Sequence, residues 1–163
     1  MNIYKNFLSK PDCNKLNDTL LSLDFPWFYA PHQVKKKITT DSSYMAHCFY
    51  RDNVINSNFY YLIKPILKKL NVDSLINIRA NLCLKRKMKN HWHSDFQKMK
   101  THPKNKVAIY YVNTNNGYTE FKNKKIKSEK NKIVIFNGDV KHRAMYQTDT
   151  DTRIIINFNY KSN

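Results

Sequence analysis

The sequence predicts an α+β protein with a mainly β core, an antiparallel sandwich or barrel with helices packed outside it. Residues 76–160 hold short β-rich runs separated by turn residues, whereas residues 1–75 carry apolar residues at helical spacing. The 163 residues, 41% hydrophobic and 13% aromatic, are enough for one real core. We therefore expect a single domain over residues 1–163.

The first half of the chain holds two helix candidates. Ser9 followed by Pro11 is typical of a helix start, and the leucines that follow predict a helix over about residues 10–23. A second periodic run predicts a helix over 54–70 that is interrupted or kinked near Pro65. Residues 25–29 read as an extended aromatic segment, and the basic stretch 31–43 reads as a loop able to cover a site.

The second half predicts β-strands. Five runs rich in β-branched and aromatic residues lie at 76–83, 106–112, 118–121, 132–136 and 153–160. Asn115-Asn116-Gly117 predicts a hairpin between two of them, and Asn137-Gly138-Asp139 predicts a turn shortly before His142.

The formal net charge of +17 favours contact with a polyanion such as a nucleic acid. A bias toward Lys, Asn and Ile, as an AT-rich genome produces, explains the same charge, and the lysines are scattered in small groups. Both explanations stay open.

Other bulk features narrow the class of protein. No run approaches the about 18 apolar residues of a membrane span, and the N-terminus lacks a signal peptide's apolar region. We therefore expect a soluble, cytoplasmic protein without membrane contact. Cys13, Cys48 and Cys83 are odd in number and widely separated, which indicates neither a disulfide framework nor a zinc–cysteine site.

The segment His91-Trp-His-Ser-Asp95 places two imidazoles and a carboxylate at alternating positions, which share one face of an extended strand. Two imidazoles and one carboxylate suit nonhaem Fe(II), because they occupy one face of an octahedron and leave three positions open. His142, after the Asn-Gly-Asp turn, is the best candidate for the remaining ligand. The His-x-Asp pattern by itself is weak, and only about one such tripeptide in ten marks a true site.

Arg153 begins the last predicted strand. Its guanidinium can bind a carboxylate through two parallel hydrogen bonds. The alternative is an ordinary surface ion pair with Asp149 or Asp151.

Taken together in order, several segments resemble the Fe(II)/2-oxoglutarate-dependent oxygenase superfamily. The similarity is greatest to its prolyl-hydroxylase-like branch and to small forms from phages and marine bacteria, and it covers about residues 76–160. It implies a double-stranded β-helix, the cupin-like jelly roll, supported by helices from residues 1–75. The segments are His93-Ser-Asp95, Ile109-Tyr-Tyr-Val-Asn113, Gly117-Tyr-Thr-Glu-Phe121, Ile135-Phe-Asn-Gly-Asp-Val-Lys-His142 and Arg153-Ile-Ile-Ile-Asn-Phe158.

The resemblance also implies roles for residues. His93, Asp95 and His142 would hold Fe(II). Arg153 would bind the distal carboxylate of 2-oxoglutarate, and Tyr111 would donate a hydrogen bond to it. The implied activity is a dioxygenase that uses O2, with ascorbate in support, to hydroxylate or demethylate a substrate while 2-oxoglutarate becomes succinate. Asn81 is a further candidate for contact with 2-oxoglutarate or substrate, although an exposed strand asparagine without such a role is the favoured alternative.

Several alternatives stay open. The substrate is a protein side chain, a nucleic acid or a small molecule, although Asn159 stands where related nucleobase demethylases carry a second arginine. A basic nucleic-acid-binding jelly roll without oxygenase turnover is the alternative function. A cupin-type site built on His91 and His93 is weakened by Gln97 and Lys98, which occupy the region of the cupin glutamate. His47 is a candidate for lining the substrate entrance, but we favour its interpretation as a hydrogen-bonded, partly buried histidine.

Overall fold

The computed structural model describes residues 1–31, 43–96 and 104–163, and its strands form two antiparallel sheets. The larger sheet has the order β1-β9-β6-β11-β5-β3-β2, with β4 paired to β3, and the smaller has the order β10-β7-β8. The larger sheet contains β1 (Asn2–Tyr4), β2 (Phe28–Ala30), β3 (Tyr44–Arg51), β4 (Val54–Ile55), β5 (Val72–Leu84), β6 (Asn105–Tyr111), β9 (Lys132–Asn137) and β11 (Thr152–Ser162). The smaller contains β7 (Tyr118–Phe121), β8 (Lys124–Lys127) and β10 (His142–Met145).

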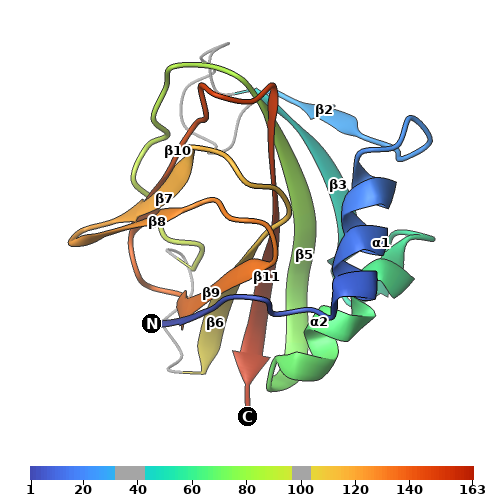
Figure 1. The fold of residues 1–163 in the computed structure, drawn as a ribbon. Coiled ribbons are helices and arrows are strands. Elements are labelled where there is room, and N and C mark those ends of the chain that lie inside the picture. Colours follow the sequence, from blue (N-terminus) through green and yellow to red (C-terminus); the bar gives the residue numbers. More distant parts are fainter. Residues whose placement is uncertain (32–42, 97–103) are drawn as a thin grey trace.

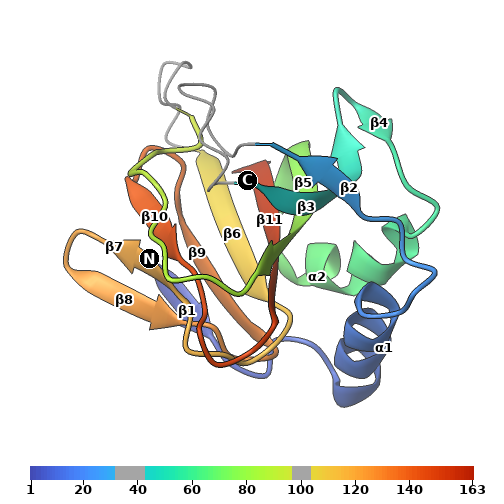
Figure 2. The ribbon, with the colours of Figure 1, turned by 90° about the horizontal axis from the view of Figure 1, so that it is seen from above.

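The smaller sheet faces one half of the larger sheet, and together they make the expected cupin-like jelly roll (Figures 1 and 2). Buried side chains fill the space between the two layers. Val107, Ile109 and Val134 come from the larger sheet, and Phe121 and Ile126 come from the smaller.

The helices cover the other face of the larger sheet, beside β3 and β5 (Figure 1). They are α1 (Lys10–Leu20), the 3-10 turn η2 (Tyr60–Ile63) and α2 (Lys64–Lys69). Leu16, Leu20 and Ile66 pack there against Ile78 and Phe158 of the sheet. Ser9 caps α1, because its Oγ accepts a hydrogen bond from the Asp12 backbone N–H at 3.3 Å.

The long strands β5 and β11 separate the two cores. Successive side chains of a strand point to opposite faces. Ile78 and Ile156 accordingly pack toward the helices, whereas Arg79 and Asn157, which face each other across the strand pair, line the cavity between the sheets. This alternation gathers polar residues from two strands on one interior face.

The helix expected over 54–70 is wrong over its first part. Val54–Ile55 instead pairs with β3 through a tight turn at Asp52 and Asn53, both of which have positive φ. The expected interruption near Pro65 is present, because the 3-10 turn ends at Ile63 and Pro65 lies in the first turn of a separate helix, α2. β3 is a further strand in a half of the chain that we expected to be largely helical.

The hairpin expected at Asn115-Asn116-Gly117 is also wrong, because β6 and β7 lie in different sheets. Side-chain hydrogen bonds instead stabilise the segment between β6 and β7 as a crossover between the two sheets. The Asn115 Oδ1 accepts a hydrogen bond from the Gly117 N–H at 3.1 Å, and the Asn116 N–H donates to the Asp149 carboxylate at 2.9 Å.

Three further expectations concern the cysteines, the basic loop and membrane-spanning segments. The three cysteines are free thiols, as expected. The loop at 31–43 falls almost wholly outside the described residues, as do Gln97 and Lys98. In the described parts of the chain, no helix has the length and apolar character needed to cross a membrane.

Candidate metal and anion site

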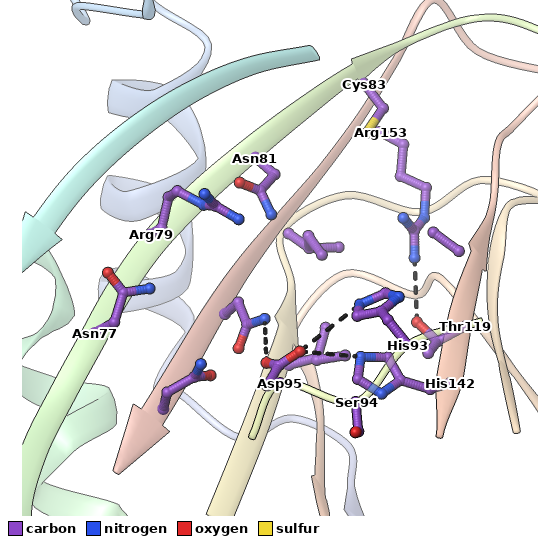
Figure 3. Close-up of a pocket in the computed structure, with 15 residues that line it drawn as sticks. Asn77, Arg79, Asn81, Cys83, His93, Ser94, Asp95, Thr119, His142 and Arg153 are labelled. Carbon is purple, nitrogen blue, oxygen red and sulfur yellow. Dashed lines mark hydrogen bonds and ion pairs between the residues drawn. The ribbon is translucent and has the colours of Figure 1, made fainter. Parts of the chain in front are cut away.

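His93, Asp95 and His142 converge at one point between the sheets (Figure 3). A reciprocal pair of backbone hydrogen bonds, 3.0 and 2.8 Å long, joins His93 to His142 at the start of β10 and brings their imidazoles together. The Nε2 atoms of the two rings lie 3.7 and 3.8 Å from the Asp95 Oδ1.

Both rings present a lone pair to this point. The Nδ1 of His93 lies 3.1 Å from the His91 carbonyl, and the Nδ1 of His142 lies 3.1 Å from the Val140 carbonyl. Because a carbonyl can only accept, each Nδ1 carries the proton and each Nε2 is free to bind a cation. Burial lowers the pKa of His142, which keeps that ring neutral near pH 7.

The Asp95 carboxylate is also oriented. Asn157 on β11 donates a hydrogen bond from Nδ2 to the Asp95 Oδ2 at 3.0 Å, which leaves Oδ1 facing the two imidazoles. Two neutral imidazoles and one carboxylate oxygen are the donor set that nonhaem Fe(II) takes on one face of its octahedron. The residues present therefore fit the metal that the sequence implies.

Arg153 extends into the same cavity and is 1% exposed. Its Nε donates to the Ser128 Oγ at 2.7 Å, and its Nη2 donates to the Thr119 Oγ1 at 3.3 Å. Within the described residues no carboxylate pairs with it, so the alternative of a surface ion pair with Asp149 or Asp151 is wrong. A buried guanidinium without a counter-charge is costly, and an anionic ligand would relieve that cost.

Thr119 connects Arg153 to Tyr111. The fully buried Tyr111 donates a hydrogen bond from its hydroxyl to the Thr119 Oγ1 at 2.8 Å, and its ring centroid lies 5.8 Å from the Arg153 Cζ. Burial raises the pKa of Tyr111, so the phenol stays protonated. Because the Thr119 oxygen accepts from both neighbours, its own proton is available to a ligand in the cavity.

Two glycines make room for these side chains. A Cβ at Gly117 would lie 2.8 Å from the Arg153 Cδ, which is too close for a methyl group. A Cβ at Gly138 would overlap the ring of Phe96, the buried residue that follows Asp95. Both glycines are therefore required by close approach.

The cavity has a volume of about 320 Å³, within the range of small-molecule sites. Of the residues expected from the sequence, the three metal-ligand candidates, Arg153 and Asn81 line it, and Tyr111 lies behind Thr119. His91 is exposed and lies outside the metal-ligand cluster.

Sequence reasoning missed Thr119, Ser128 and Asn157. Strand alternation could have found Asn157, because it lies four residues after Arg153 and thus on the same face of β11. Ser128 follows β8, a strand that the sequence did not predict, so no signal pointed to it.

No protein-family model and no curated protein matches the sequence. Among solved structures, the fold is similar to a prolyl hydroxylase from Trichoplax adhaerens in complex with a hypoxia inducible factor oxygen degradation domain peptide, with a TM-score of 0.67 and 11% identity over 98% of this chain and 83% of that one. It is also similar to a 2OG-Fe(II) oxygenase family oxidoreductase from Burkholderia pseudomallei, with a TM-score of 0.65 and 6% identity over 96% of this chain and 82% of that one. A Pseudomonas putida prolyl-4-hydroxylase gives a TM-score of 0.58 and 10% identity over 99% of this chain and 92% of that one. At identities this low, the likeness establishes the shared fold.

Proposed function

We propose that this chain is an Fe(II)- and 2-oxoglutarate-dependent dioxygenase that hydroxylates or demethylates its substrate. One observation carries the proposal. The buried guanidinium of Arg153, which pairs with no carboxylate of the described residues, shares a cavity with two imidazoles and an oriented carboxylate. The chain thus offers a cation site and an anion site in one pocket, as a metal-chelating dicarboxylic keto acid requires.

His93, Asp95 and His142 would hold the iron. When bound, iron, O2 and 2-oxoglutarate supply the oxidising chemistry, in which one oxygen atom enters a substrate C–H bond and the other enters succinate as CO2 leaves. Ascorbate would serve to keep the iron reduced. The chain's own contribution is to fix three ligands and leave the remaining coordination positions open.

Arg153 would bind the distal carboxylate of 2-oxoglutarate. Ser128 and Thr119 hold its guanidinium, and the Thr119 hydroxyl would donate a further hydrogen bond to the same carboxylate. Tyr111 would act through Thr119, because its hydroxyl donates to the Thr119 oxygen. These donors are already aligned by the fold, which reduces the cost of ordering them on binding.

Within the superfamily, we propose the prolyl-hydroxylase-like branch. The order of sequence segments supports it, and so does the likeness of the fold to two prolyl hydroxylases. The resemblance to small phage and marine-bacterial forms rests on the sequence segments alone.

Succinate formation tests the proposal. With Fe(II), 2-oxoglutarate and ascorbate in air, wild-type protein is expected to form succinate slowly even without substrate, and Asp95→Ala is expected to form none. Asp73→Ala, at an exposed aspartate near the start of β5, is the matched control and should behave as wild type. Folded wild-type protein that forms no succinate, or Asp95→Ala that forms as much, would refute the activity.

A further inference from the structure

The cavity has a second polar wall, which includes neither the metal-ligand candidates nor Arg153. Figure 3 shows Asn77, Arg79 and Asn81 along β5 on the left of the cavity, whereas Arg153 and Thr119 lie on its right. Asn157 and Asn159 of β11 complete the wall, because they pair in register with Arg79 and Asn77. We call these five residues the amide wall.

Four buried polar atoms of the amide wall have no hydrogen-bond partner among the described residues: the Arg79 Nε and the Oδ1 atoms of Asn81, Asn157 and Asn159. Asn81 is 6% exposed. Buried polar groups are normally hydrogen-bonded, and each orphan costs about 1–3 kcal/mol. Several orphans in one wall of a cavity indicate that a ligand supplies their partners.

Arg79 is the charged member of the wall. Its guanidinium Cζ lies 5.5 Å from the ring centroid of Tyr44, a cation–π contact that leaves the charge uncompensated. No ion pair joins Arg79 to a carboxylate in the described parts of the chain. An anionic ligand in the cavity would supply the counter-charge that Arg79 lacks.

Asn157 defines a second requirement. Its Nδ2 already donates to Asp95, so the amide orientation is fixed and the orphan Oδ1 must accept from a ligand N–H or O–H. A phosphate, which mainly accepts hydrogen bonds, meets only the Arg79 requirement. A carboxylate close to an N–H donor meets both.

The lining of the cavity argues against a nucleobase. Bases extruded into enzyme pockets stack on aromatic or apolar side chains. Apart from the two candidate metal-ligand imidazoles, the lining contains no aromatic side chain among the described residues, and the amide wall presents carboxamides to the cavity.

We infer that the amide wall is the substrate site and that the substrate presents a carboxylate to Arg79 and an N–H donor to Asn157. This inference rests on the proposed function, which assigns Arg153 and the metal to 2-oxoglutarate. Two sources share the required chemistry: a free α-amino acid, and a peptide in which an acidic side chain lies near a backbone N–H.

Ligand-observed NMR on the wild-type protein, loaded with Zn(II) in place of iron and with 2-oxoglutarate, tests the inference. One arm uses the free amino acids against their α-amides. The other uses the blocked tripeptides Ac-Gly-Asp-Gly-NH2 and Ac-Gly-Glu-Gly-NH2 against their Asn and Gln counterparts. In at least one arm, the carboxylate probes should bind about tenfold or more tightly than their amides, because the lost hydrogen bonds are charge-assisted. The arm that responds identifies the source.

Substitutions at Arg79 test whether the amide wall causes the preference for carboxylate probes. Arg79→Gln should abolish the discrimination between carboxylate and amide probes, and Arg79→Lys should restore part of it. Arg51→Gln, at an exposed arginine of β3 paired with Asp52, is the matched control and should leave it unchanged. Retained binding of 2-oxoglutarate by Arg79→Gln would show that the variant is folded.

Wild-type protein that holds Zn(II) and 2-oxoglutarate but binds no probe, or binds the amides equally well, would overturn the inference and leave the proposed function standing. Wild-type protein that fails to bind 2-oxoglutarate would instead refute the proposed function. The carboxylate preference, measured again without 2-oxoglutarate, would still test the amide wall.

Discussion

Two side chains four residues apart on β11 serve the two parts of the site, the anion site and the metal site. Arg153 supplies a buried positive charge, and Asn157 fixes the Asp95 carboxylate through a 3.0 Å hydrogen bond. The sequence led to Arg153 through its place at a strand start, but it could not show that the guanidinium is buried. That fact depends on Ser128 and Thr119, which come from distant segments and each accept one hydrogen bond from it.

Arg153→Met tests the role of the buried charge. We expect the variant to unfold at a higher temperature than wild type without ligand, because an uncompensated buried charge is removed. We also expect 2-oxoglutarate to stop raising the melting temperature, whereas a ligand at 100 times its Kd should stabilise wild type by about 2.7 kcal/mol. Calorimetry with and without 2-oxoglutarate measures both effects. Equal stabilisation of the two proteins would exclude Arg153 as the anchor.

Asn157→Leu tests the orientation of Asp95. Loss of the amide donor frees the carboxylate to rotate, so affinity for Fe(II) or Zn(II) should fall about 10- to 100-fold. Asn159→Leu makes the same change two residues along the same face and should leave metal affinity unchanged. Competition against a chromophoric chelator gives both values, and equal affinities in the two variants would disprove the positioning role.

At the scale of elements, the strands of the second half were largely predictable, because β-branched and aromatic runs between turn residues are a local signal. Their pairing was not. Asn115-Asn116-Gly117 looked like a hairpin turn, yet Asp149 binds the Asn116 N–H and the chain crosses to the other sheet. That partner lies 33 residues away, beyond the reach of local sequence reasoning.

Alanine substitution at the two glycines should lower two different affinities. Gly117→Ala should displace the Arg153 side chain and lower affinity for 2-oxoglutarate about tenfold, with metal affinity retained. Gly138→Ala should displace Phe96 beside Asp95 and lower metal affinity instead. Overpacking of this kind costs about 1–3 kcal/mol. Titrations of each variant with Zn(II) and with 2-oxoglutarate distinguish the two effects, and identical behaviour of the two variants would contradict this account of the glycines.

For the whole molecule, the sequence predicted the jelly roll through the resemblance, whereas composition alone gave only a β core with helices outside. The helix expected over 54–70 is wrong in its first part, because Val54 and Ile55 extend the sheet as β4. The charge of +17 stays without an assigned role. Nucleic-acid binding remains a prediction. If it occurs through the lysines, the affinity for nucleic acid should fall steeply as the salt concentration rises.

Buried histidines predict the pH dependence of stability. His47 is 4% exposed and hydrogen-bonded to the Pro26 carbonyl and the Ser57 hydroxyl, and burial lowers its pKa. An unfolded chain takes up this proton at about pH 6.5. The contribution of His47 to stability is therefore complete above about pH 6.5 and is lost as the pH falls through its lower folded pKa.

Urea unfolding of the metal-free protein at pH 7.5 and pH 5.5 should show lower stability at pH 5.5. His47→Gln should make this difference smaller, while the buried His142 keeps part of it. His91→Gln, at an exposed histidine, should leave it as in wild type. A difference that His47→Gln does not reduce would argue against a buried neutral His47.

The most direct test of the central claim is the visible metal-to-ligand charge-transfer absorption of protein mixed with Fe(II) and 2-oxoglutarate without oxygen. The band requires both ligands in one pocket, so we expect it in wild type, no band in Asp95→Ala, and a band in Arg153→Met only at much higher 2-oxoglutarate concentration. Folded wild-type protein without the band, or Asp95→Ala with an undiminished one, would contradict the assignment of this cavity to iron and 2-oxoglutarate.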